Sequence, residues 1–159
     1  EGEGAAFRLI EGPADISDCA MLTGEVPRVT AFERVASSLQ MPEDGRWVQD
    51  NLFDDQAMIV RTEEGIVVVL GCAHVGIVNT LEYARQITGE ERIVAVVGGT
   101  HLGPASKEQL ESTISALRGY KIGRLGVSHC TGLKAAARLA QEFGDSFFFN
   151  VAGTVTELP

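Results

Sequence analysis

Three histidines recur at nearly equal intervals along the chain, and imidazole both binds metals and carries protons near neutral pH. They are His74, His101 and His129, which lie 27 and 28 residues apart. Each follows an apolar run that ends in small residues, and each precedes a glycine by two or three positions. One strand–helix unit takes about 30 residues, so each histidine falls at the same stage of three successive units.

This spacing predicts that the three imidazoles share one edge of a sheet. In α/β proteins the carboxyl ends of parallel strands meet at a common edge, and ligands bind there. Neutral imidazole suits zinc, and also manganese, iron, nickel or copper. A single histidine is more often a hydrogen-bonded core or surface residue, but three at one topological position favour a shared metal site. Zinc lowers the pKa of bound water to about 7, which makes hydrolytic chemistry the expectation.

Acidic and thiol side chains near these histidines are further candidates. Asp54 and Asp55 precede a predicted strand, where they either complete a two-metal site or occupy an exposed turn. Cys72 and Cys130 are each interpreted as a soft ligand, a reactive thiol or a small buried packing residue. Thr131 belongs to "HCTG", and the backbone at such a helix start is a candidate cradle for an anion.

The elements that must position these residues alternate between strand and helix after residue 53. Two apolar runs around "TEEG" predict a hairpin, and three helices are predicted from their apolar faces and start or stop signals. Alternation of this kind favours an α/β fold with largely parallel pairing. The expected strands are 57–61, 66–70, 92–97, 123–128 and 146–151, and the expected helices are 77–87, 104–119 and 133–143.

Residues 1–53 are expected to form a loop-rich segment at the periphery of the site, and 54–159 a domain half built of strand–helix repeats. The 159 residues carry a net charge of −9, which argues against non-specific binding to nucleic acid. We expect neither a membrane span nor a secretory signal. The odd number of cysteines, three, indicates a reducing compartment, and we therefore expect a cytoplasmic protein.

Several segments taken together resemble a known family. "DDQAMIV", "GIVVVLGCAHVGIVNT", "VVGGTHL" and "SHCTG" are similar to the C-terminal half of metal-dependent hydrolases of the metallo-β-lactamase superfamily. The nearest subgroup includes dihydropterin–ribofuranosylaminobenzene-phosphate synthases of methanopterin biosynthesis, and "LTGEVPRVTAFERV" also resembles that subgroup. The likeness therefore runs over most of the chain.

The resemblance implies an αββα sandwich of two similar halves, with divalent metal between them at the strand ends. It implies that His74 and His129 are metal ligands and that His101 is either a third ligand or a catalytic contact with the substrate. Asp55 matches a subgroup motif near the site and is a second catalytic candidate. Arg28 lies in a loop that is expected, with Thr131, to contact a small and anionic substrate.

One feature of the superfamily is missing from this sequence, namely its main ligand motif His-x-His-x-Asp-His. We therefore expect that the site is incomplete without an N-terminal half and that the chain associates with a missing segment, a second chain or a copy of itself. The leading hypothesis is a metal-dependent hydrolase, or a related pterin-linked synthase, that uses a metal-activated water. The alternatives are a non-catalytic module that binds metal, an anion or a partner, and a thiol-based redox protein.

Overall fold

Strand β6 lies at the centre of the sheet because its side chains are apolar on both faces, as in a strand that is covered on both sides. A computed structural model describes residues 2, 4 and 6–157. Its seven-stranded sheet has the order β1-β2-β5-β6-β7-β8-β9. These strands are β1 (Ala14–Asp15), β2 (Ala20–Leu22), β5 (Ala57–Thr62), β6 (Gly65–Leu70), β7 (Ile93–Gly99), β8 (Arg124–Ser128) and β9 (Phe147–Phe149).

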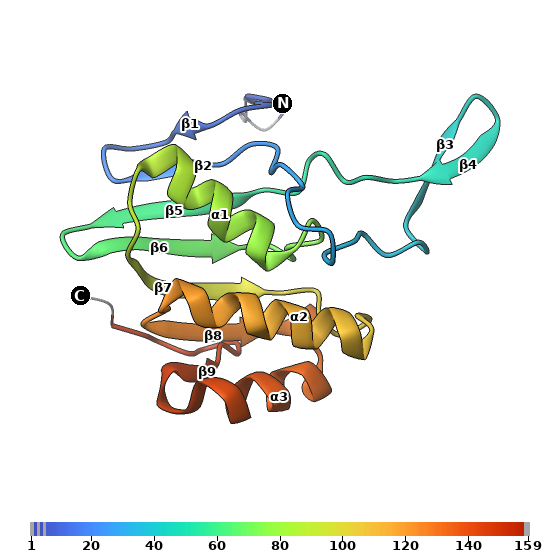
Figure 1. The fold of residues 1–159 in the computed structure, drawn as a ribbon. Helices are drawn as coiled ribbons and strands as arrows, with labels where there is room; N and C mark the ends of the chain where they lie inside the picture. The colour runs from blue at the N-terminus through green and yellow to red at the C-terminus, as the bar shows by residue number, and fades with distance from the viewer. Residues whose placement is uncertain (1, 3, 5, 158–159) are drawn as a thin grey trace.

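The helices cover one face of this sheet (Figure 1). Strands β6, β7, β8 and β9 are parallel and adjacent in chain order, so every crossover moves in the same direction across the sheet. Because such crossovers share one hand, all three helices are placed on the same side. They are α1 (Ile77–Thr88), α2 (Lys107–Leu117) and α3 (Leu133–Phe143), with short 3-10 turns η1 (Arg118–Tyr120), η2 (His129–Thr131) and η3 (Gly144–Ser146).

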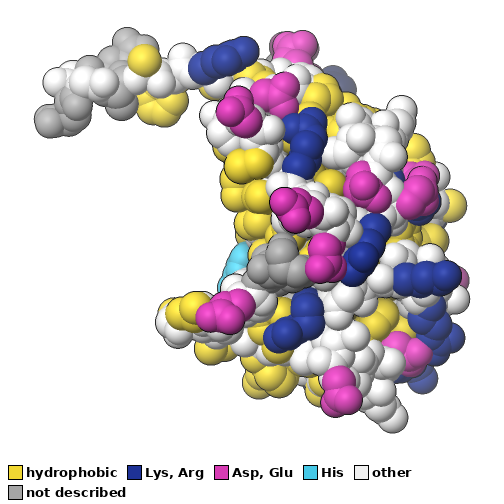
Figure 2. Space-filling model, turned by 90° about the vertical axis from the view of Figure 1, so that its left-hand side faces the viewer, with side chains coloured by type: hydrophobic (Ala, Val, Ile, Leu, Met, Phe, Trp, Pro, Cys, Tyr) yellow, Lys and Arg dark blue, Asp and Glu magenta, His cyan; other side chains and the backbone are white. Residues whose placement is uncertain are grey.

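The main core lies between the helices and the sheet, where the helices' apolar stripes meet inward-facing strand residues. The opposite face of the sheet carries no helix in the described part of the chain (Figure 1). Its apolar residues Val67, Val94 and Ala95 are buried, and Val60 and Val69 are half-buried beside them. Hydrophobic side chains gather along a hollowed side of the molecule, where a histidine is also visible (Figure 2).

The predicted elements after residue 53 are confirmed. Ser106 caps α2, and its side chain accepts a hydrogen bond from the Gln109 N–H, as the capping signal predicts. Gly144 ends α3. The antiparallel pairing of β5 and β6 confirms the predicted hairpin. The sheet is less parallel than predicted, because β1 and β2 extend it with antiparallel pairs.

The loop-rich segment 1–53 contains strands too short to leave a clear pattern. β1 and β2 extend the main sheet, while β3 (Gln40–Glu43) and β4 (Arg46–Gln49) form a separate hairpin that projects from the body (Figure 1). The division of the chain at residue 53 stays a prediction. Among the described helices, none combines the length and apolar character needed to cross a membrane.

Candidate metal centre

Hydrogen bonds join the loops that follow β6, β7 and β8 into one continuous edge, which we call the rim (residues 71–76, 99–105 and 129–132). The Gly99 N–H donates to the carbonyl of Gly71 at 3.1 Å, which joins the first two loops. The Gly103 N–H donates to the carbonyl of Cys130 at 3.1 Å, which joins the second and third. Each loop carries one of the three histidines, so the structure places all three at the same edge of the sheet.

His74 and His101 form a close pair at this rim. Their ring centroids are 4.0 Å apart and the rings are tilted by 47°. The Nδ1 atom of each ring is buried and has no hydrogen-bond partner within the described residues. A buried polar atom without a partner costs about 1–3 kcal/mol, so two together call for an additional group. A cation fits this need, because the two nitrogens are metal-ligating atoms.

The charge environment favours the neutral form of His101, which is the form that binds metal. Burial lowers the pKa of His101, and the neighbouring rings of His74 and His129 lower it further. The carboxylate of Asp55 opposes this effect by raising the same pKa. His74, His129 and Asp55 therefore all lie close enough to His101 to act on its charge.

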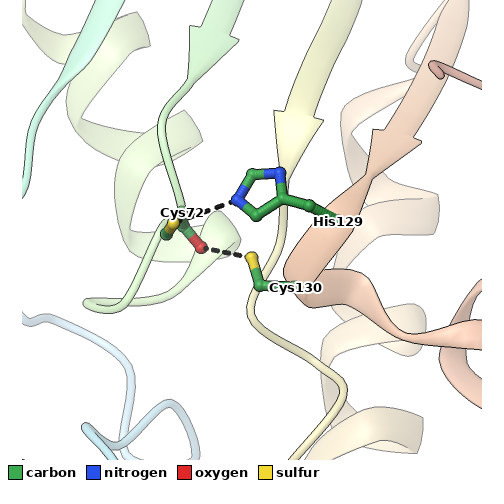
Figure 3. Close-up of side chains that lie close together, drawn as sticks. All are labelled: Cys72, His129 and Cys130. Carbon is green, nitrogen blue, oxygen red and sulfur yellow. Dashed lines mark hydrogen bonds between the residues drawn. The ribbon is translucent and has the colours of Figure 1, made fainter. Parts of the chain in front are cut away.

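The third histidine contacts sulfur, as Figure 3 shows. The Nε2 atom of His129 lies 3.0 Å from the Sγ atom of Cys72, and its Nδ1 lies 3.0 Å from the hydroxyl of Ser128. The thiol of Cys130 donates to the carbonyl of Cys72 at 3.5 Å. Burial raises the pKa of the Cys130 thiol to about 11, so this thiol is protonated at neutral pH in the absence of a cation.

The tight donor group at the rim is not the three histidines. Within the described residues, the potential ligand atoms of Cys72, His129 and Cys130 all lie within 4.8 Å of one another. The sequence pattern identified the shared rim but did not group these two thiols with an imidazole. The metal-ligand roles of His74, His101 and His129 stay predictions.

Backbone strain is concentrated at the rim. Ala73, His101 and His129 adopt positive φ values of 50°, 47° and 22°, a region that residues other than glycine rarely occupy. Such conformations cost about 1–3 kcal/mol each and cluster at functional sites, where surrounding contacts hold them. One strained residue therefore lies in each of the three loops.

Known proteins match this chain in sequence and in fold. It is 39% identical over 147 residues to a 7,8-dihydropterin-6-methyl-4-(β-D-ribofuranosyl)-aminobenzene-5′-phosphate synthase of Methanocaldococcus jannaschii, covering 91% of this chain and 50% of that protein. An uncharacterised protein of the same archaeon is 31% identical over 137 residues, covering 86% of this chain and 50% of the relative. No protein-family model matches the chain.

A solved structure matches the fold of this chain. The crystal structure of a metal-dependent hydrolase of the β-lactamase superfamily superimposes with a TM-score of 0.84 and 29% identity, covering 95% of this chain and 58% of that one. The chain has the fold of the metallo-β-lactamase superfamily. It spans about half the length of the curated relatives that it matches.

Asp55 and Arg28, the two loop residues suggested by the superfamily resemblance, differ in their relation to the rim. Asp55 contacts the rim directly, whereas Arg28 contacts the segment that precedes Asp55. Asp55 is half-buried, and its carboxylate accepts a hydrogen bond from the Val75 N–H at 2.9 Å, directly after His74. Arg28 is exposed; its guanidinium donates to the carbonyl of Asn51 and lies 5.3 Å from the centre of the Phe53 ring. Their predicted catalytic and substrate-binding roles stay predictions.

Thr131 links the loop after β8 to the loop after β7 by hydrogen bonds. Its buried hydroxyl accepts hydrogen bonds from the N–H of Thr100 at 3.2 Å and pairs with the Thr100 hydroxyl at 3.0 Å. The side chain is therefore committed to the protein itself. Any contact between Thr131 and a substrate falls to its backbone.

Sequence reasoning missed Glu33, a buried carboxylate that caps α1. It accepts hydrogen bonds from the N–H groups of Val78 and Asn79, each at 2.8 Å. Asn79 in turn accepts from the N–H of Thr30 at 2.9 Å, which ties the Arg28 loop to the helix that follows His74. A polar asparagine in the apolar run "GIVNTL" is the sequence signal for this clamp.

Proposed function

We propose that this chain supplies the C-terminal half of a metal-dependent enzyme of the metallo-β-lactamase superfamily, either a hydrolase or a related pterin-linked synthase, that uses a metal-activated water. The observation that carries the proposal is the pair of buried, unpartnered Nδ1 atoms on His74 and His101. The similarity to a named synthase and to a metal-dependent hydrolase supports an enzymatic role.

His74, His101 and His129 are the residues that we propose hold the metal. Zinc is expected first because imidazole nitrogens suit it, and manganese, iron or nickel are compatible with the same ligands. A divalent cation bound there would supply a hydroxide-like water near neutral pH and polarise a substrate oxygen. Because burial and the other rings lower the pKa of His101, its ring is available as a neutral ligand at neutral pH.

The remaining candidate residues orient the site and the substrate. Asp55 holds the loop of His74 through the Val75 N–H, and its charge acts on His101. We propose that this carboxylate accepts a proton in the reaction. Arg28 and the backbone at Thr131 are proposed to bind a small anionic substrate. The name of the M. jannaschii synthase includes a phosphate, which agrees with an anionic group in this substrate class.

A second half of the fold is the proposed partner. The chain covers half of each curated relative, and one face of its sheet has no helix over it in the described residues. Val60 and Val69 on that face are only half-buried, and burial of their remaining apolar surface against a second layer would be favourable at about 25 cal/mol per Å². The occupant is a segment outside this sequence, a second chain, or another copy of this one.

Metal titration of single histidine variants tests the proposed function. His74→Ala and His129→Ala are each expected to weaken zinc binding by about tenfold or more, measured by competition with a chromophoric chelator. Cys19→Ser is the control, because Cys19 is exposed and lies outside the rim. Unchanged zinc affinity in both histidine variants would contradict the proposal.

A non-catalytic binding module is the alternative that one observation favours. The sequence has no histidine before His74, so all of its imidazole ligands come from the three rim loops. Such a set can bind a metal without completing a catalytic site. Turnover by the chain together with a second half would identify an enzyme. Metal binding with no turnover by that complete assembly would identify a binding module.

A further inference from the structure

We propose that Cys72, His129 and Cys130 form a soft-donor metal site, in which two thiolate sulfurs and one imidazole nitrogen bind a zinc-type divalent cation. The inference rests on the proposed function, because His129 is also one of the predicted metal ligands. It selects, for Cys72 and Cys130, the soft-ligand role among the roles that the sequence left open. It also assigns a role to two cysteines that the proposed enzyme does not otherwise use.

The first support is convergence from two strands that are not neighbours. Cys72 follows β6, whereas His129 and Cys130 lie in η2 after β8, and β7 separates these strands in the sheet. The ligand atoms of all three nevertheless lie within 4.8 Å of one another. The Cys72 sulfur lies within hydrogen-bond distance of the imidazole nitrogen of His129 (Figure 3).

The second support is a cradle at the end of the intervening strand. Gly99 ends β7, and a Cβ atom there would lie 2.6 Å from the Cys130 sulfur and 2.7 Å from Nε2 of His129. Glycine is therefore required for the donors to meet above β7. An alanine at this position would occupy the space beside the Cys130 sulfur and the His129 ring.

The third support is the set of contacts that orient the donors. Ser128 pairs with the Nδ1 atom of His129, which leaves Nε2 directed at Cys72. The N–H of His101 donates to the Cys130 sulfur at 3.3 Å, and an N–H donor of this kind stabilises a thiolate. Metal ligands are commonly held by such neighbouring hydrogen bonds.

The donor set also determines the ligand chemistry. Thiolate ligands favour zinc and other soft or borderline cations over magnesium and calcium. Two cysteines and one histidine leave a fourth position open, which is the ligand count of a catalytic zinc site. As each sulfur–metal bond forms, the thiol releases its proton to solvent, so the step needs no oxidant or reductant. Simple packing does not explain cysteines that stay partly exposed at a polar edge.

Cobalt(II) titration of the 159-residue chain in a thiol-free reductant tests the site. The expected result is a near-ultraviolet sulfur-to-cobalt charge-transfer band in the wild-type chain and in the Cys19→Ser control. Cys72→Ser and Cys130→Ser should each weaken this band and lower cobalt affinity by about tenfold or more, and the double variant should lose the band. Circular dichroism establishes that the serine variants are folded.

Alkylation of the wild-type chain gives a readout that needs no variant. Iodoacetamide labelling followed by peptide mass spectrometry should show that zinc slows the modification of Cys72 and Cys130. The labelling of Cys19 should not change, since Cys19 is exposed elsewhere on the chain. Labelling rates of Cys72 and Cys130 that are the same with and without zinc would overturn the proposal.

The two proposals fail in different ways. Cobalt binding that His74→Ala weakens, but that has no sulfur-to-cobalt band, would overturn the thiol site and leave the histidine site standing. A sulfur-to-cobalt band that is unchanged in His74→Ala would support the thiol site while contradicting a role for His74. Absence of any cobalt binding would overturn both.

Discussion

Individual side chains at the rim are arranged more for binding than for packing. His74 and His101 each have a buried ring nitrogen without a partner among the described residues. Buried polar atoms in proteins are normally hydrogen-bonded. His101 and His129 also hold strained backbone conformations. Strained conformations of this kind cluster at functional sites. A cation bound by these nitrogens would offset the free-energy cost of leaving them unpartnered and of straining the backbone.

Gly99→Ala is the sharpest test at this scale. The added methyl group would collide with the Cys130 sulfur and the His129 ring, so we expect metal affinity to fall by about tenfold or more. Overpacking of this kind should also lower the free energy of unfolding by about 1–3 kcal/mol. Metal competition and urea denaturation measure the two effects.

Gly119→Ala is the matched control for that substitution. A Cβ at Gly119 meets no atom within 4 Å, so both properties should stay close to wild type. Metal affinity in Gly99→Ala equal to that of Gly119→Ala would show that the donors do not bind a metal where they converge.

The secondary-structure elements explain how distant side chains reach one edge. Successive parallel strands carry their loops to a common edge, and the regular spacing of the histidines predicts this from sequence. The helices were also predictable, since their apolar periodicity and capping residues are local signals. β1 and β2 have two and three residues and left no such signal.

Which donors touch could not be predicted in the same way. The contact between Cys72 and His129 depends on the positive φ of His129 and on the space above Gly99. These are properties of the folded backbone rather than of residue spacing. The sequence therefore identified the rim and its histidines, but not the thiol–imidazole group.

The cap on α1 gives a prediction at the scale of elements. Glu33→Ala would leave the N–H groups of Val78 and Asn79 without their acceptor, and should lower the free energy of unfolding by about 2 kcal/mol in urea denaturation. Glu25→Ala, which removes an exposed carboxylate from the same loop, is the control and should be nearly neutral. Equal stability of the two variants would contradict the capping role.

The same carboxylate should affect the pH dependence of stability. Burial raises the pKa of Glu33 above its ordinary value of 4.5, and its N–H donors oppose this only in part. Between the ordinary pKa of the unfolded state and the raised pKa of the folded state, folding takes up a proton. The free energy of unfolding of the wild-type chain should therefore fall as pH rises through this window. Glu33→Gln should lack this component, because its side chain does not titrate.

At the scale of the whole molecule, the chain forms one layer of helices on one sheet. The shared hand of the crossovers places every helix on one face and leaves valines on the other. Domains normally bury both faces of a sheet with such valine-rich central strands, so a second layer is the expected complement. The rim lies at the strand ends, where that layer would enclose the donors.

Diffraction at the zinc absorption edge, from crystals of the zinc-loaded chain, tests the central claim most directly. The account predicts an anomalous peak at the rim, between the loops 71–76, 99–105 and 129–132, about 2.0–2.1 Å from a histidine nitrogen. Zinc found only on carboxylates away from these loops, with no peak at the rim, would contradict it.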